Sequence, residues 1–231
     1  MKNQTLILGI GNLLWADEGF GVRAVEQLHR DYQFDDHVKL MDGGTQGLYL
    51  VHHVQEADIL LVFDAIDYGL EPGTMKLIKG EDVPKFMGAK KMSLHQTGFQ
   101  EVLAMAEMLG QYPKHLLLVG VQPVQLEDYG GSLREKTRQQ IQPAIDAALA
   151  WLKNFNIHAT RRDQPLPPEA SLSGAEITLD NYENHRPSAE QACRIGDDRV
   201  LHSKDFHVQY KPHPLEPDAA ISCDVDHRGK Y

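Results

Sequence analysis

The sequence predicts an α/β fold in which a mostly parallel, five-stranded sheet lies between two layers of helices. Short and nearly continuous apolar runs are typical of strands that are buried on both faces. Segments with helical periodicity separate most of these runs, and this alternation favours crossover connections between parallel strands. A length of 231 residues suits one domain of this kind with an appendage.

Five segments have the apolar character of strands, and glycine or acidic residues follow several of them. They are residues 5–11, 38–41, 59–63, 74–78 and 116–121. The segment 74–78 is short and alternates in polarity after a Glu-Pro-Gly turn. In open sheets of this class, binding sites gather at the carboxyl ends of the strands.

Four segments have apolar residues at helical spacing and fill the intervals between these strands. They are residues 19–32, 47–54, 98–109 and 133–155. We expect the last helix to kink or restart at Pro143, because proline lacks an N–H group and clashes with the preceding turn.

The character of the sequence changes after the last predicted helix. A proline-rich segment begins near residue 164, and the remainder is polar and lacks a sustained period. We therefore expect an α/β domain over residues 1–160 and a C-terminal extension over residues 161–231 that is partly irregular or disordered.

Composition excludes several classes of protein. A formal net charge of −10, without a long Lys/Arg run, argues against a nucleic-acid partner. Cys193 and Cys223 lack the paired spacing of a zinc site or a disulfide scaffold. No apolar run approaches the length of about 20 residues that a membrane-spanning helix needs. We expect a cytoplasmic protein without membrane insertion.

The loop after the first strand, residues 9–21 (GIGNLLWADEGFG), allows competing interpretations. Its first two glycines match the start of a dinucleotide-binding motif, which would indicate a Rossmann-type oxidoreductase. The third glycine of that motif is replaced by Leu14, and Asp17 and Glu18 lie where a pyrophosphate needs positive potential. For Asp17, a stabilising position at a helix N-terminus is a simpler explanation.

Two carboxylates and one imidazole can converge if the strands stack in parallel. Glu18 follows the first strand, Asp64 ends the third, and His95 precedes a helix. Such a set suits a divalent ion with oxygen and nitrogen preference, or acid and base catalysis of hydrolysis. Each residue alone also suits a helix cap or a loop hydrogen bond, so spacing leaves both interpretations open.

Asp42 begins a glycine-rich segment, residues 42–47 (DGGTQG), at the end of the second strand. Paired glycines permit a close backbone approach that would admit an extended peptide. A tight turn in which Asp42 caps the next helix is the alternative.

Five of these segments resemble the nickel-iron hydrogenase maturation endopeptidases, which remove a C-terminal peptide from the hydrogenase large subunit. The similarity is greatest to members that serve membrane-bound uptake hydrogenases, and it covers about residues 4–155. The segments are residues 9–21, 41–47 (MDGGTQG), 63–69 (FDAIDYG), 92–96 (MSLHQ) and 118–123 (LVGVQP).

The resemblance implies a twisted sheet between helices and a bacterial cytoplasmic setting. It also implies that Glu18, Asp64 and His95 contact nickel, and that Asp42 is a candidate catalytic acid. The resemblance further implies that the nickel is carried by the substrate, the large subunit precursor, rather than permanently bound. Whether nickel acts in catalysis, with Glu18, Asp64 or His95 as base, stays open. A non-cleaving checkpoint chaperone of the large subunit is the alternative function.

Overall fold

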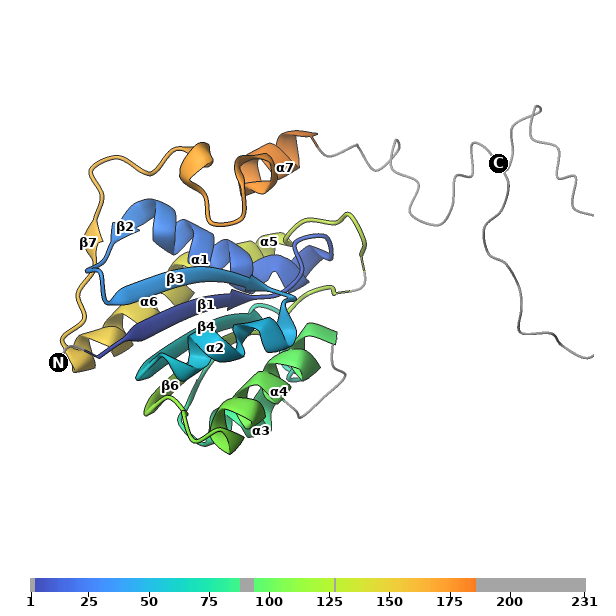
Figure 1. Cartoon of the computed structure of the whole chain (residues 1–231). Helices are drawn as coiled ribbons and strands as arrows, with labels where there is room; N and C mark the ends of the chain where they lie inside the picture. The colour runs from blue at the N-terminus through green and yellow to red at the C-terminus, as the bar shows by residue number, and fades with distance from the viewer. Residues whose placement is uncertain (1–2, 88–93, 127, 186–231) are drawn as a thin grey trace, which may run out of the picture. The chain divides into compact units, whose positions relative to one another are not determined.

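The computed structural model describes residues 3–87, 94–126 and 128–185, with the backbone but not the side chains described at residues 85–87 and 94–97 (Figure 1). Contacts divide the chain into two compact units, Met1–Ser188 and Ala189–Tyr231. The second unit, which contains Cys193 and Cys223, lies outside the described residues.

The central sheet has five strands in the order β3-β1-β4-β6-β5. Their bounds are Thr5–Ile10 (β1), Val38–Gly44 (β3), Ile59–Ala65 (β4), Met75–Lys79 (β5) and His115–Val121 (β6). The first four strands of this order are parallel, and β5 pairs antiparallel with β6 at the edge. The predicted mostly parallel, five-stranded sheet is confirmed.

The strand register aligns the carboxyl ends that carry candidate site residues. Gly9 of β1 pairs with Asp42 of β3 on one side and with Phe63 of β4 on the other. Asp64 pairs with Gly120 of β6. The chain runs from β1 to β3 on one side and then crosses to β4 on the other. This reversal is the topological switch point at which open α/β sheets hold their sites.

Helices cover both faces of the sheet, as predicted (Figure 1). The helices α1 (Phe20–Asp31) and α6 (Ile141–Leu152) pack on one face, in a core cluster that includes Ile7, Leu61 and Phe63. The other face carries α2 (Val51–Gln55), α3 (Asp82–Met87) and α4 (Leu94–Met108). None of the helices in the described part of the chain has the length and apolar character to span a bilayer.

The predicted helix over residues 133–155 is divided into three pieces. These are α5 (Glu135–Arg138), α6 and the 3-10 turn η3 (Lys153–Phe155). Because α6 begins at Ile141, Pro143 lies in its first turn, where backbone N–H groups have no intrahelical acceptor. The expected restart is therefore observed, two residues before the proline.

Residues after 160 continue the compact unit that contains the sheet, which extends to Ser188. The short strand β7 (Thr160–Arg161) pairs antiparallel with β2 (Tyr32–Gln33). The chain then forms η4 (Pro168–Ala170), η5 (Ala175–Ile177) and α7 (Leu179–His185), which lie over α1 (Figure 1). We call residues 162–185 the strap. The break expected at residue 160 is absent from the contacts, because α1 offers the strap a surface on which to dock.

The first turn of α1 is in backbone contact with the sheet. A Cβ atom at Gly21 would lie 2.1 Å from the carbonyl oxygen of Phe63 and 2.3 Å from that of Ile10. A Cβ atom at Gly9 would lie 2.3 Å from the carbonyl oxygen of Gly21. Glycine is therefore required at both positions for the helix to approach β1 and β4 this closely.

We predict that Gly21→Ala lowers the free energy of unfolding by about 3 kcal/mol, because the added methyl group clashes with backbone oxygens. Gly98→Ala is the matched control, since its Cβ would meet nothing closer than 3.4 Å within a helix. There alanine is expected to be neutral, or stabilising by up to about 1 kcal/mol. Urea unfolding of both variants measures the difference, and equal stability of the two would contradict the close contact.

Candidate active site

Glu18 is brought to the end of β4 by the loop after β1. This residue lies in the 3-10 turn η1 (Ala16–Gly19), which packs against β4. Gly11 has φ +138°, and a Cβ there would lie 1.8 Å from the carbonyl oxygen of Glu18, so the loop folds back onto the end of β1. Glu18 is half-buried, three residues before the contact of Gly21 with Phe63.

Asp64 follows Phe63 and is fully buried at the carboxyl end of β4. Together, the two backbone contacts place Glu18 and Asp64 at the same end of the β1–β4 pair. The structure therefore brings these two predicted site residues to one edge of the sheet.

Tyr68 extends the site beyond the residues that the sequence pattern singled out. A Cβ atom at Gly120 would lie 2.3 Å from the hydroxyl oxygen of Tyr68, so the ring occupies space beside the residue that pairs with Asp64. Burial raises the pKa of the Tyr68 phenol, and the negative charge of Asp64 raises it further. Tyr68 therefore remains neutral at physiological pH beside the buried carboxylate.

Gln122, which follows β6, holds the loop that carries Tyr68. Its Oε1 accepts hydrogen bonds from the backbone N–H groups of Tyr68 (2.8 Å) and Leu70 (3.1 Å). Its Nε2 donates to Asp67 Oδ1 at 2.9 Å. Since Gln122 is 5% exposed, these bonds satisfy a buried amide and fix the β4 loop against β6.

Asp17 joins the loops after β1 and β6. Its side chain is fully buried, and Oδ2 accepts from the N–H groups of Val124 (2.7 Å) and Gln125 (3.0 Å). Oδ1 accepts from the N–H of Arg134 at 2.7 Å. Although Asp17 lies in the first turn of η1, these contacts are to a distant loop and not those of a helix cap. A single sequence carries no signal for partners more than 100 residues away.

We predict that Asp17→Asn lowers the free energy of unfolding by about 3 kcal/mol. The new NH₂ group would face backbone N–H donors, and the remaining amide oxygen is an acceptor without charge. Hydrogen exchange in residues 124–134 should accelerate more than in the core strands. Asp146→Asn is the control, since the Asp146 carboxylate on α6 is exposed and bonds to Gln142 of the same helix. Unchanged exchange in residues 124–134 would contradict the linking role of Asp17.

His95 is the second residue of α4. One turn later, a Cβ atom at Gly98 would lie 3.4 Å from the Cα of Gly47, at the start of the 3-10 turn η2 (Gly47–Leu50). The backbone of His95 therefore lies at the carboxyl edge, near the loop after β3. Among the described side chains, to which that of His95 does not belong, no group of three His, Cys, Asp or Glu is arranged to hold a metal ion.

Asp42 is held at the carboxyl end of β3. Its Oδ2 accepts a hydrogen bond from the hydroxyl of Ser173 in the strap at 2.5 Å. Its Oδ1 is buried and has no hydrogen-bond partner among the described residues. Asp42 does not cap the next helix, because η2 has no side-chain cap. A hydrogen bond of 3.1 Å from the N–H of Gly11 to the carbonyl of Gly44 joins the loop after β1 to the end of β3.

Apolar side chains are exposed on the loops after β1 and β6. Trp15 and Tyr129 pack edge to face with ring centroids 5.5 Å apart, and Leu14 and Val124 are each 44% exposed. A backbone bond from the N–H of Gly130 to the carbonyl of Leu14 holds the two loops together at 2.7 Å. The candidate site thus combines carboxylates at the strand ends with exposed apolar groups on adjacent loops.

Comparison with known proteins identifies the class of this fold and site. The model of the hydrogenase maturation protease family matches residues 22–151. The structure of the hydrogenase maturating endopeptidase HybD from Escherichia coli superposes with a TM-score of 0.66 and 39% identity, covering 70% of this chain and 98% of that one.

Relatives are also similar over a longer part of the chain. The hydrogenase expression/formation protein HupD of Thiocapsa roseopersicina is 60% identical over 200 residues, covering 87% of this chain and 90% of that protein. HoxM of Cupriavidus necator is 55% identical over 194 residues, covering 84% of this chain and 96% of that protein. The chain belongs to the hydrogenase maturation protease family, and it is a peptidase. The resemblance noted in the sequence is confirmed.

Proposed function

We propose that this peptidase removes the C-terminal peptide of a nickel-iron hydrogenase large subunit precursor after nickel has been inserted. Family membership supports the proteolysis of a hydrogenase protein. The observation that carries the proposal is the meeting of Glu18 and Asp64 at the switch point, with the backbone of His95 at the same edge of the sheet. The precursor is the partner, and the reaction takes place in the cytoplasm.

In this proposal the nickel ion belongs to the substrate. Carboxylate oxygens and an imidazole nitrogen suit a first-row divalent metal. Three ligands from Glu18, Asp64 and His95 leave coordination positions open for the groups with which the precursor already holds the ion. A cation at this edge also offsets the cost of burying the Asp64 carboxylate. Cleavage then reports that nickel loading is complete.

Asp42 is proposed as the catalytic acid. A water molecule attacks the scissile carbonyl carbon, and one of Glu18, Asp64 and His95 takes the proton of that water. The C–N bond then breaks as Asp42, in its carboxylic acid form, protonates the leaving amine nitrogen, and the proton held by the base restores that acid. The hydrogen bond from Ser173 supports this role, because it gives the Asp42 side chain a fixed position at the carboxyl end of β3. The exposed apolar loops beside Glu18 provide a surface for the polypeptide that approaches it.

We predict that the protein shortens a nickel-loaded large subunit precursor by one C-terminal peptide and leaves the nickel-free precursor intact. Mass spectrometry of the precursor before and after incubation measures both reactions. An unchanged mass of the nickel-loaded precursor, with folded protease present, would overturn the proposed cleavage. Stable binding without a released peptide would instead favour the checkpoint chaperone.

We predict that His95→Ala reduces the rate of processing by at least about 100-fold, because the loss of one acid, base or ligand group typically has an effect of this size. Circular dichroism and the unfolding midpoint should remain those of the wild type. His52→Ala is the control, since this histidine is 75% exposed on α2. Normal processing by the His95 variant would remove His95 from the site.

A further inference from the structure

The strap is attached to the body of the protein at its beginning. The N–H of Arg162 donates to the carbonyl of Asp31 at 2.8 Å, and the N–H of Leu166 donates to the carbonyl of Arg30 at 3.0 Å. These bonds extend the β2–β7 pairing along the C-terminal end of α1. The strap therefore starts at a fixed place on the helix that leads from the candidate site.

The far end of the strap is attached to the loop after β6. Glu183 of α7 accepts hydrogen bonds from the hydroxyl of Ser132 and, at 2.6 Å, from the guanidinium of Arg138. The hydroxyl of Tyr182 donates to the carbonyl of Gly131 at 3.3 Å. Residues 131–138 belong to the same chain segment that Asp17 holds through Arg134. Both ends of the strap are thus fixed to elements that shape the candidate site.

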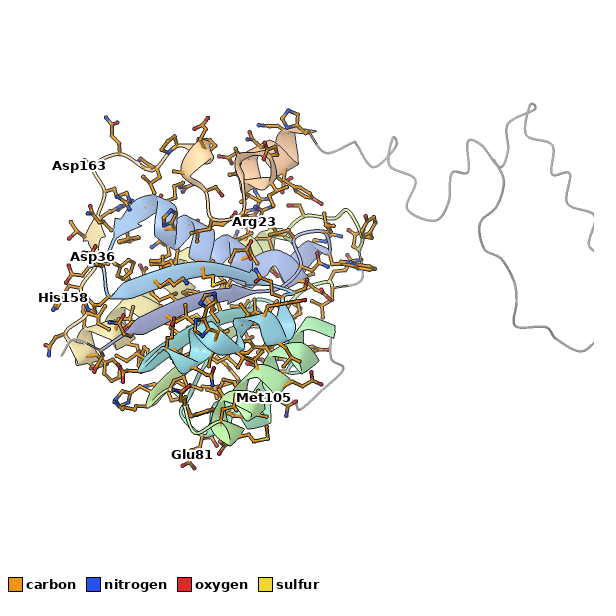
Figure 2. The ribbon with its side chains drawn as sticks, viewed as in Figure 1. Arg23, Asp36, Glu81, Met105, His158 and Asp163 are labelled. Carbon is orange, nitrogen blue, oxygen red and sulfur yellow. The ribbon has the colours of Figure 1, made fainter. Side chains whose placement is uncertain are left out.

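Arg23 of α1 contacts the strap at Ile177 and Tyr182. This side chain of α1 is 4% exposed, and Figure 2 shows it on the side of the helix that faces the strap. It donates to the carbonyl of Ile177 at 2.5 Å and lies 5.7 Å from the ring centroid of Tyr182. A buried guanidinium requires such partners, so the position of η5 is defined by charge as well as by packing.

At Ser173 the strap contacts the carboxyl end of β3. The preceding residue, Leu172, packs against the core cluster of α1 and α6, and Gly174 turns the chain with φ +104°. Between these two anchors, Ser173 donates its hydroxyl to Asp42 Oδ2 at 2.5 Å, across 131 residues of sequence. The hydroxyl therefore occupies Oδ2 and restricts the rotation of the Asp42 side chain.

We propose that Ser173 is a positioning residue for catalysis, which holds the Asp42 side chain in one orientation through its bond to Oδ2. This inference rests on the proposed function, in which Asp42 is the catalytic acid. With one oxygen occupied by Ser173 and the other unpartnered among the described residues, the carboxylate has a defined orientation before substrate binds. Ser173 is thereby the residue of the strap that acts on the proposed catalytic edge.

The strap lies in a part of the chain that aligns with the longer relatives. An aligned stretch of 200 residues must include the whole strap wherever it begins in a chain of 231. The HybD structure, in contrast, is covered to 98% by 70% of this chain. We therefore expect the strap to fix Asp42 in proteins of the HupD type.

The test is the steady-state cleavage of nickel-loaded precursor by three variants. Ser173→Ala should lower kcat about tenfold, the rate equivalent of one hydrogen bond, and leave KM unchanged. Ser173→Thr keeps the hydroxyl and should restore kcat to within about twofold. Thr178→Val is the matched control, because the Thr178 hydroxyl donates to the carbonyl of Ala175 within the strap and, among the described residues, not to Asp42. Wild-type kcat for Ser173→Ala would overturn the proposal.

A double-mutant cycle separates positioning from general stability. In an Asp42→Asn background, Ser173→Ala should cause no further loss of kcat, since the hydroxyl acts through the carboxylate. If the losses of kcat caused by the two substitutions multiply in the double variant, the proposal is overturned. Faster cleavage by Ser173→Ala would also overturn it, and would indicate that the strap covers the site instead.

A measurement without substrate keeps this inference distinct from the proposed function. The ¹³C resonance of the Asp42 carboxyl carbon should shift in Ser173→Ala and return in Ser173→Thr. If wild-type protein fails to cleave the precursor, the proposed function fails and the catalytic role of Ser173 falls with it. A shifted resonance would still establish that Ser173 orients Asp42, and an unchanged resonance would refute that as well.

Discussion

The candidate site depends on one steric constraint, the contact of the α1 backbone with the ends of β1 and β4. Gly9 and Gly21 have no side chains, so the helix approaches until its first turn touches the carbonyl oxygens of Ile10 and Phe63. The 3-10 turn before the helix then has to lie over the end of β4. Close-packed backbone does not yield easily, and the separation of Glu18 and Asp64 is therefore set by glycines that carry no chemistry themselves.

Buried polar side chains perform a second task, because they connect loops that have little apolar surface of their own. Asp17 joins the β1 loop to the β6 loop, and Gln122 joins the β6 loop to the β4 loop. Each bonds mainly to backbone groups, so the loop conformation is specified independently of most neighbouring side chains. Fully satisfied networks of this kind make a site rigid before substrate arrives.

Much of the fold was predictable from the sequence, because strands buried on both faces appear as apolar runs and the switch point follows from their order. This reasoning also brought Glu18 and Asp64 to one edge. It did not identify α3, a six-residue helix, or the exact pieces of the segment 133–155. The strap was expected to be partly irregular because it has no apolar period. Its order comes from Arg23 and from Asp42, and contacts across more than 100 residues leave no local pattern.

The sequence distance between Asp42 and Ser173 also determines the order in which the molecule can be completed during synthesis. Every strand of the central sheet is made before the strap, so the sheet can form while the Asp42 carboxylate still lacks its partner. Contacts between distant residues are late because a long loop must close first. A nascent chain therefore contains Asp42 well before it contains the strap that bonds to it. If Ser173 positions Asp42 as proposed, translation itself delays the activity until the strap has docked.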